Sequence, residues 1–298
     1  MINKNILLLL SFICIFFQFS NAQKYTELAS FGWQYSPTNT YKTINTNCDI
    51  SDINLSLKSP IVLKNKNVVI TGVSFNRLAF KGDSLYGNSN FSAFVLQAGY
   101  LHNFNDNNSL TLIALPKISG DYKNITHHNF QMGGIILFTN KKSDKLKLKY
   151  GCYYNNEFFG SLIVPIFGFD WKANSKLRLF GNLPITATAE FEISSRLSLG
   201  LFFNSNSTSY LFDKEKKYIN KNTQEISIFS DFYFTKNIAL QAKVGYTIGR
   251  NYNLFAENDK MDAKISFIKI NDDRTQLNNL ELKDGIIAEV KFVYRVFQ

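Results

Sequence analysis

The chain has 298 residues, of which 45% are hydrophobic, 15% aromatic and only 19% charged. The 28 phenylalanines and 15 tyrosines exclude a disordered chain, because so much apolar surface can be buried or shielded by lipid. Three cysteines are too few for a disulfide scaffold. Cys48 and Cys152 can pair in an oxidising compartment, but their spacing does not demand it, and we expect both to be free thiols.

The first 22 residues have the three parts of a secretory signal peptide. Lys4 lies in a short polar start, an apolar run follows from Ile6 to Phe17, and the stretch ends in Ser20-Asn21-Ala22. We expect cleavage after Ala22, because signal peptidase reads small residues at these positions. The alternative is an uncleaved anchor, which needs about 20 apolar residues, more than this run holds. The predicted mature chain, residues 23–298, is a single domain.

The mature chain alternates between apolar and polar residues with a period of two. This period is typical of β-strands with two different faces, because successive side chains of a strand point to opposite sides. The segments 145–152, 225–234, 238–248 and 286–296 show it. In 238–248 the apolar face holds Ile238, Leu240, Ala242, Val244, Tyr246 and Ile248. The sequence therefore predicts an all-β protein.

Alternation fits a soluble β-sandwich as well as a membrane barrel, and three features favour the barrel. The alternating segments run about 9 to 12 residues, the length that a tilted strand needs to cross a bilayer. Aromatic residues gather at strand ends, as in Phe31-Gly32-Trp33 and Phe169-Asp170-Trp171. The second face carries lysines and glutamates, which suit an ion-paired lumen better than a dry core. The predicted fold is a transmembrane antiparallel up-and-down β-barrel, with a secreted sandwich that carries lipid as the alternative.

Short connections alternate with longer ones along the chain. The short ones are 64–67, 105–108, 141–144, 172–175, 194–195 and 235–237. The others are 36–50, 81–90, 117–129, 155–160, the tight 182–184, 204–224 and 250–284. Outer-membrane barrels have short periplasmic turns, long outer loops and an even strand number, so this order predicts about 12 to 14 strands with both termini in the periplasm. The alternating segment 263–270 is placed as an extra hairpin in the last outer loop or as a plug.

Several short motifs carry a resemblance to a known family. They are 170–174 (Asp-Trp-Lys-Ala-Asn), 177–184, 233–237, 242–246, 272–274, 284–285 and 294–295. With them the chain resembles an uncharacterised family of outer-membrane β-barrel proteins found mainly in Bacteroidota, a domain-of-unknown-function family. The resemblance implies location and fold, and it lends no functional residues. The chain end resembles the signal read by the barrel-assembly machinery only in part, because Gln298 follows Phe297.

Residues suited to catalysis are few. An outer-membrane lipase or acyltransferase needs serine and histidine with an acidic or amide partner. His102 lies beside a predicted periplasmic turn, whereas His127 and His128 lie in a predicted outer loop with Ser119 and Asp121 nearby. A lipid-modifying enzyme that uses one of this histidine pair is therefore the alternative function. Neighbouring histidines make a poor metal site, and we expect no catalytic, cofactor-binding or metal-binding residues and no cofactor.

Removing Lys4 with the signal leaves 32 of the 33 basic residues against 23 acidic ones, a net charge of +9. Nucleic acid is an unsuitable partner for an exported chain. The clusters Lys141-Lys142 and 214–217 are expected to contact phosphates of outer-membrane lipid or lipopolysaccharide, and Lys145, Lys147 and Lys149 to favour anions in a lumen. Alternatively, these lysines only keep strands and loops soluble. The expected function is a small passive pore, of unknown solute, or a structural barrel.

Overall fold

The computed structural model describes residues 25–42, 47–82, 87–212, 215–277 and 282–297, and the predicted signal peptide lies outside them. The strands are β1 (Tyr25–Thr40), β2 (Asn47–Val62), β3 (Val68–Lys81), β4 (Asn90–Asn103), β5 (Asn108–Gly120), β6 (Phe130–Ser143), β7 (Leu146–Glu157), β8 (Gly160–Lys172), β9 (Leu177–Leu183), β10 (Thr186–Ser194), β11 (Leu197–Phe212), β12 (Lys217–Tyr233), β13 (Ile238–Ala256), β14 (Ala263–Ile265), β15 (Ile268–Ile270) and β16 (Ile286–Phe297). A 3₁₀ turn, η1 (His127–Asn129), precedes β6. Among the described residues, no helix is long and apolar enough to cross a membrane.

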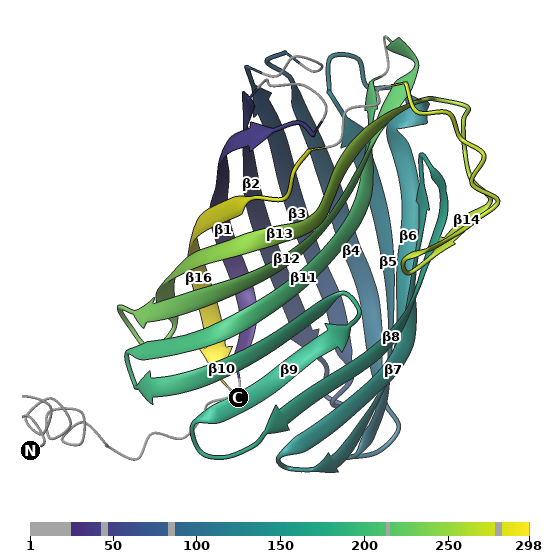
Figure 1. The fold of residues 1–298 in the computed structure, drawn as a ribbon. Helices are drawn as coiled ribbons and strands as arrows, with labels where there is room; N and C mark the ends of the chain where they lie inside the picture. The colour runs from purple at the N-terminus through teal and green to yellow at the C-terminus, as the bar shows by residue number, and fades with distance from the viewer. Residues whose placement is uncertain (1–24, 43–46, 83–86, 213–214, 278–281, 298) are drawn as a thin grey trace, which may run out of the picture.

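The strands form a closed antiparallel barrel (Figure 1). Strands β1 to β13 pair in chain order, and β16 lies between β13 and β1, so the wall has no free edge. Of the sixteen strands in the sheet, β14 and β15 form a side hairpin, which leaves fourteen in the wall. The prediction of a 12- to 14-stranded all-β barrel is therefore confirmed, at its upper value.

The apolar face of the strands points away from the lumen. On β12, Ile226 and Ile228 are 51% and 62% exposed, whereas Glu225 and Asp231 on the opposite face are 6% and 0% exposed. The same holds on other strands, whose outward residues include Trp33, Leu201, Val244 and Val290. A water-soluble protein rarely leaves so continuous an apolar surface uncovered. The alternative of a soluble sandwich is wrong, because in a sandwich these side chains would pack against a second sheet.

The two ends of the barrel differ in the way predicted from the connection lengths. The tight turns between β2 and β3, β4 and β5, β6 and β7, β8 and β9, β10 and β11, and β12 and β13 lie at one end, where β1 begins and β16 ends (Figure 1). Short turns face the periplasm in such barrels, so we call this the periplasmic end and the other the outer end.

Parts of the longest outer connections form β-strands. The segment 263–270 forms the β14–β15 hairpin in the last connection, as predicted, and β14 pairs in parallel with β8. The prediction that 204–224 is a polar loop is wrong. Strand β11 continues to Phe212 and β12 begins at Lys217, and the two pair along their whole length. The outer ends of β11, β12 and β13 therefore remain paired with one another where they are no longer part of the barrel wall.

Candidate functional site in the barrel lumen

Charged side chains fill the lumen as ion pairs between strands. The alternating sequence places lysine, arginine, glutamate and aspartate on the inner face, where closure of the barrel brings opposite charges together. The pairs are Lys117–Glu157 at 3.0 Å, Lys221–Asp52 at 3.0 Å, Arg178–Asp170 at 2.9 Å, Lys291–Glu27 at 2.7 Å, Arg295–Asp231 at 2.6 Å, and Lys243 with Glu289. The paired lumen predicted from the sequence is thereby confirmed. Such pairing is needed because an unpaired buried charge is strongly destabilising.

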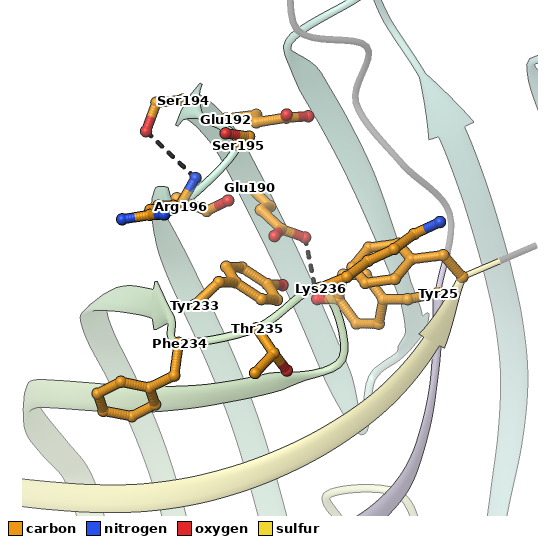
Figure 2. A pocket seen from close by; sticks show the side chains of 12 residues that line it. Tyr25, Glu190, Glu192, Ser194, Ser195, Arg196, Tyr233, Phe234, Thr235 and Lys236 are labelled. Atoms are coloured by element: carbon orange, nitrogen blue, oxygen red, sulfur yellow. Dashed lines mark hydrogen bonds between the residues drawn. The ribbon is translucent and has the colours of Figure 1, made fainter.

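A tyrosine held by two arginines narrows the periplasmic end. The ring of Tyr25 lies 4.3 Å from the guanidinium carbon of Arg295 and 5.1 Å from that of Arg178. The Tyr25 hydroxyl donates to Glu190 Oε2 at 3.0 Å (Figure 2). Below this ring, the turns at 194–196 and 234–236 surround a cavity of about 390 Å³. This cavity is the periplasmic mouth of the lumen.

On the other side of Tyr25 lies a cavity of about 430 Å³, which we call the central cavity. Its lining holds six cationic side chains and two carboxylates: Lys58, Lys149, Arg178, Lys243, Lys291 and Arg295 against Glu27 and Asp170. Among the described residues, Lys149 has no hydrogen-bond or ion-pair partner, and the buried Nη1 of Arg178 has no acceptor. Glu289 and Asp231, which pair with Lys243 and Arg295, lie outside this lining, so the excess of positive charge rests on Lys58 and Lys149, which have no ion-pair partner among the described residues. Of the three lysines predicted to line a lumen, Lys149 does so here.

The outer end of the lumen is closed by the extended ends of β11, β12 and β13, which we call the inner extension. It crosses the lumen rather than following the wall, because Leu211 of β11 pairs with Gly120 of β5, six strands away in the wall order. A Cβ at Gly120 would lie 2.9 Å from the Leu211 carbonyl oxygen, so glycine permits this approach. A bulge between Asn222 and Gln224, opposite the left-handed Gly249, marks where the extension leaves the wall.

Apolar clusters cover both faces of the inner extension. One face packs against β2, β3 and β4 in a buried cluster that includes Leu78, Phe91, Tyr210 and Ile219. The other packs against β8 and the last connection in a second cluster, whose buried residues are Phe158, Phe159, Leu162, Val164, Leu211, Tyr218, Phe255 and Met261. Close-packed side chains of this kind obstruct water and ions in the part of the lumen that the described residues enclose. The outer end of the lumen is therefore shut.

A buried carboxylate fastens the inner extension to the wall. Glu157 at the end of β7 accepts hydrogen bonds from the backbone N–H and the hydroxyl of Ser209, at 2.8 and 2.6 Å. The same carboxylate accepts from Lys117 Nζ at 3.0 Å and from Gln131 Nε2 at 3.3 Å. Lys117 also donates to Thr208 Oγ1 at 2.7 Å. We call Glu157, Lys117 and Ser209 the latch.

The histidines singled out in the sequence lie apart. His102 contacts Tyr100 and Phe104 near the β4–β5 turn. The rings of His127 and His128 lie 4.1 Å apart in η1 and are tilted by 42° to each other, and His128 Nδ1 lies 3.0 Å from Glu257 Oε1. Among the described residues, neither Ser119 nor Asp121 is hydrogen-bonded to these histidines, and Ser119 donates to the Ser209 carbonyl at 2.7 Å. Within the described part of the chain, no three His, Cys, Asp or Glu side chains gather as metal ligands.

The remaining sequence candidates are surface or packing residues. Lys141 pairs with Asp144 at 2.6 Å in the β6–β7 turn, at the periplasmic end. Lys217 pairs with Glu215 at 3.1 Å, and Lys214 lies outside the described residues. Cys48 and Cys152 form no disulfide with each other, and Cys48 is buried in the cluster at β2 to β4.

Sequence reasoning missed the inner extension and its latch. The apolar groups 210–212 and 218–219 stand inside the stretch that was assigned to a loop. These apolar groups were the signal in the sequence that the stretch is buried, because a solvated outer loop has no reason to carry large apolar side chains at this density. The central cavity was anticipated only through Lys149, since its other cations come from strands far apart in sequence.

Comparisons with known proteins bear on fold and family. An outer-membrane channel from Pseudomonas putida F1 is 11% identical, with 92% of this chain and 97% of that chain covered and a TM-score of 0.49. The NanC porin is 8% identical, with 90% of this chain and 100% of that chain covered and a TM-score of 0.39. A mutant of the TodX monoaromatic hydrocarbon channel is also 8% identical, with 95% of this chain and 92% of that chain covered and a TM-score of 0.41. No curated protein matches. A family profile described as "Domain of unknown function (DUF6268)" matches residues 18–278. The chain therefore belongs to this family, as the motifs in its sequence suggested.

Proposed function

We propose that this protein is a passive outer-membrane channel for small solutes, with a lumen that favours anions and is closed at its outer end in the conformation described. The central cavity is the observation that carries the proposal. It lies behind a polar mouth, and its lining holds two lysines, Lys58 and Lys149, without an ion-pair partner among the described residues. A purely structural barrel has no need of an electropositive cavity of this size, whereas an anion pathway does.

Opening requires the inner extension to move, because the apolar clusters on its two faces block the outer end. The wall strands do not depend on it, since β8 to β13 remain paired below the bulge at Asn222. Replacing residues 208–221 by a two-residue turn removes the β11 and β12 parts of the extension, and with them Tyr210, Leu211 and Tyr218 of the two apolar clusters, and leaves that pairing in place.

The proposal is tested by conductance in planar lipid bilayers. The shortened variant is expected to conduct steadily, with a reversal potential in a salt gradient that shows anion preference, whereas the full chain is expected to conduct rarely. Heat-modifiable migration in gels shows whether each variant is a folded barrel. A folded, shortened barrel without current contradicts the channel function and leaves a structural role.

We infer further that the protein is not an enzyme. His127 and His128 lie on the surface of an outer connection, and Glu257 rather than a serine is the partner of His128. Replacing both histidines by alanine is expected to change no activity on lipid substrates. Loss of a lipid hydrolase or acyltransferase activity in this variant would restore the enzyme alternative.

We infer that the mature chain begins at Gln23, lies in the outer membrane of a Gram-negative bacterium of the Bacteroidota, and contacts lipopolysaccharide and the barrel-assembly machinery. The signal pattern, the family resemblance and the aromatic C-terminal strand support this. Mass spectrometry of the protein from outer-membrane fractions tests it, and an N-terminus other than Gln23 contradicts the cleavage site.

A further inference from the structure

The barrel wall is interrupted between β8 and β11. Strands β9 and β10 are the shortest of the wall, with 7 and 9 residues, and end well below the outer ends of their neighbours (Figure 1). The pairing of β9 with β8 stops at Phe167↔Leu183, and that of β10 with β11 stops at Thr186↔Asn204. Beyond these pairs the outer parts of β8 and β11 face each other without a wall strand between them.

A cavity of about 390 Å³ fills this interruption, and we call it the lateral site. Apolar side chains of the wall, such as Tyr153, Leu162 and Val164, line one side. Amide and hydroxyl side chains of β11 and β12, such as Asn206 and Asn222, line the other. A cavity with one apolar and one polar side matches a ligand that is itself two-sided.

The β14–β15 hairpin covers the outer edge of the lateral site. It is held to β8 by parallel pairing from Ala263↔Ser161 to Ile265↔Ile163 and by a hydrogen bond from Ser266 N to the Ile163 carbonyl. Its tip is apolar and uncovered, with Phe267 53% and Ile268 69% exposed. The hairpin therefore presents an apolar tip towards the lipid beside the cavity.

Lys264 of the hairpin brings a buried positive charge to the polar side. Its ammonium donates to Ser207 Oγ at 3.0 Å and contacts Asn222 Oδ1, both of them neutral groups. Lys264 is only 7% exposed, and no carboxylate among the described residues forms an ion pair with it. Burial lowers the pKa of Lys264 to about 8, because desolvation disfavours the ammonium form. A buried cation without a counter-ion is costly, and an anionic ligand would compensate it.

The rim of the interruption indicates where the ligand comes from. Phe167 on β8, in the last pair between β8 and β9, is 46% exposed, so lipid contacts this edge of the interruption. A volume of about 390 Å³ lies near the lower end for small-molecule pockets and is too small for a whole phospholipid.

We propose that the lateral site binds a small single-chain amphiphile with one anionic group, such as a medium-chain fatty acid, which reaches it from the bilayer. The chain lies against Tyr153, Leu162 and Val164, and the anionic group contacts Lys264. The β14–β15 hairpin acts as the lid. This inference uses the membrane setting of the proposed function but does not require conduction.

Photolabelling in lipid nanodiscs tests the proposal, with a decanoate analogue that carries a diazirine on its chain. Labelling is expected on the apolar side of the lateral site and is expected to be displaced by decanoate. Lys264→Gln is expected to weaken labelling about tenfold, the size of one charge-assisted contact. Lys260→Gln, an exposed lysine of the same connection, is the matched control and should label like the wild type.

Two further measurements separate the contribution of the apolar side of the lateral site from that of the charge on Lys264. Val164→Trp fills the apolar side and is expected to abolish labelling, while a decanol analogue of the same length is expected to label weakly because it lacks the charge. Heat-modifiable migration shows that each variant is folded. Unchanged labelling in folded Lys264→Gln and Val164→Trp overturns the proposal. A barrel that conducts but is not labelled overturns the lateral site alone, and a barrel that is labelled but never conducts overturns the channel alone.

Discussion

The latch makes a quantitative prediction about closure of the lumen. Glu157→Gln keeps the size of the side chain but removes the charge that faces Lys117 and one of the acceptor groups for Ser209. Both partners are buried, with side chains 7% and 1% exposed for Lys117 and Glu157. The substitution therefore leaves a buried ammonium without its counter-ion, and the contact between wall and inner extension is weakened.

The size of the effect of Glu157→Gln follows from the burial of the Lys117–Glu157 ion pair. Removing one partner of a buried ion pair costs about 3 to 5 kcal/mol. The wall is hydrogen-bonded on both sides of β7, so most of this cost is expected to fall on the closed position of the inner extension rather than on the barrel. At 1.36 kcal/mol per factor of ten, the ratio of closed to open molecules falls by roughly two to four orders of magnitude.

The assay is open probability in single-channel recordings. Glu157→Gln is expected to open far more often than the wild type. The matched control is Glu225→Gln, another buried luminal glutamate, which contacts Lys243 and Ser227 of the wall, whereas Glu157 also holds Ser209 of the inner extension. Replacing Lys117 and Glu157 together by leucine is expected to stay closed, because no unpaired charge remains. An unchanged open probability in a folded Glu157→Gln barrel would refute the latch.

Three other predictions concern the lipid face, the lumen and an outer connection. Ile228→Arg, which puts a charge on the 62% exposed outer face of β12, is expected to destabilise the barrel in lipid by about 2 to 4 kcal/mol, and a denaturant titration showing no loss contradicts a lipid-facing position. Lys149→Glu, in the barrel with the shortened β11–β12 tip, is expected to shift the reversal potential towards cations, and an unshifted potential means that the central cavity is not on the path. A hydrogen bond from Arg274 lowers the pKa of Asp272 from 3.8 to about 2, so its stabilising effect is complete above pH 3.8 and lost as the pH falls through 2. Proteolysis of the β13–β16 connection between pH 5 and 2 measures this effect, and Asp272→Asn should remove the pH dependence.

The wall was predictable from the sequence because each strand carries its own information. Alternation in 238–248 decides which side chains of β13 meet lipid, and the turn lengths decide the order and direction of the strands. Neither signal depends on distant residues. The outer end was not predictable in this way, because Leu211 meets Gly120 only after the barrel has closed.

The candidate site was recognisable only in part for the same reason. Lys149 stood out in a row of alternating lysines, and the structure places it in the central cavity. Arg178 and Arg295 of that cavity come from β9 and β16, and nothing in either segment shows that they share Tyr25. The lateral site depends on the shortness of β9 and β10, and the tight turn at 182–184 showed neither that shortness nor what covers the interruption.

The inner extension gives the two halves of this barrel different kinds of cohesion. Charge pairs dominate the periplasmic half, whereas a close-packed apolar core like that of a water-soluble domain dominates the outer half. Apolar cohesion weakens on cooling, while ion pairs respond to salt and pH. Cooling is therefore expected to loosen the outer half first, whereas acid is expected to loosen the periplasmic half first. The two halves of one barrel thus respond to different treatments.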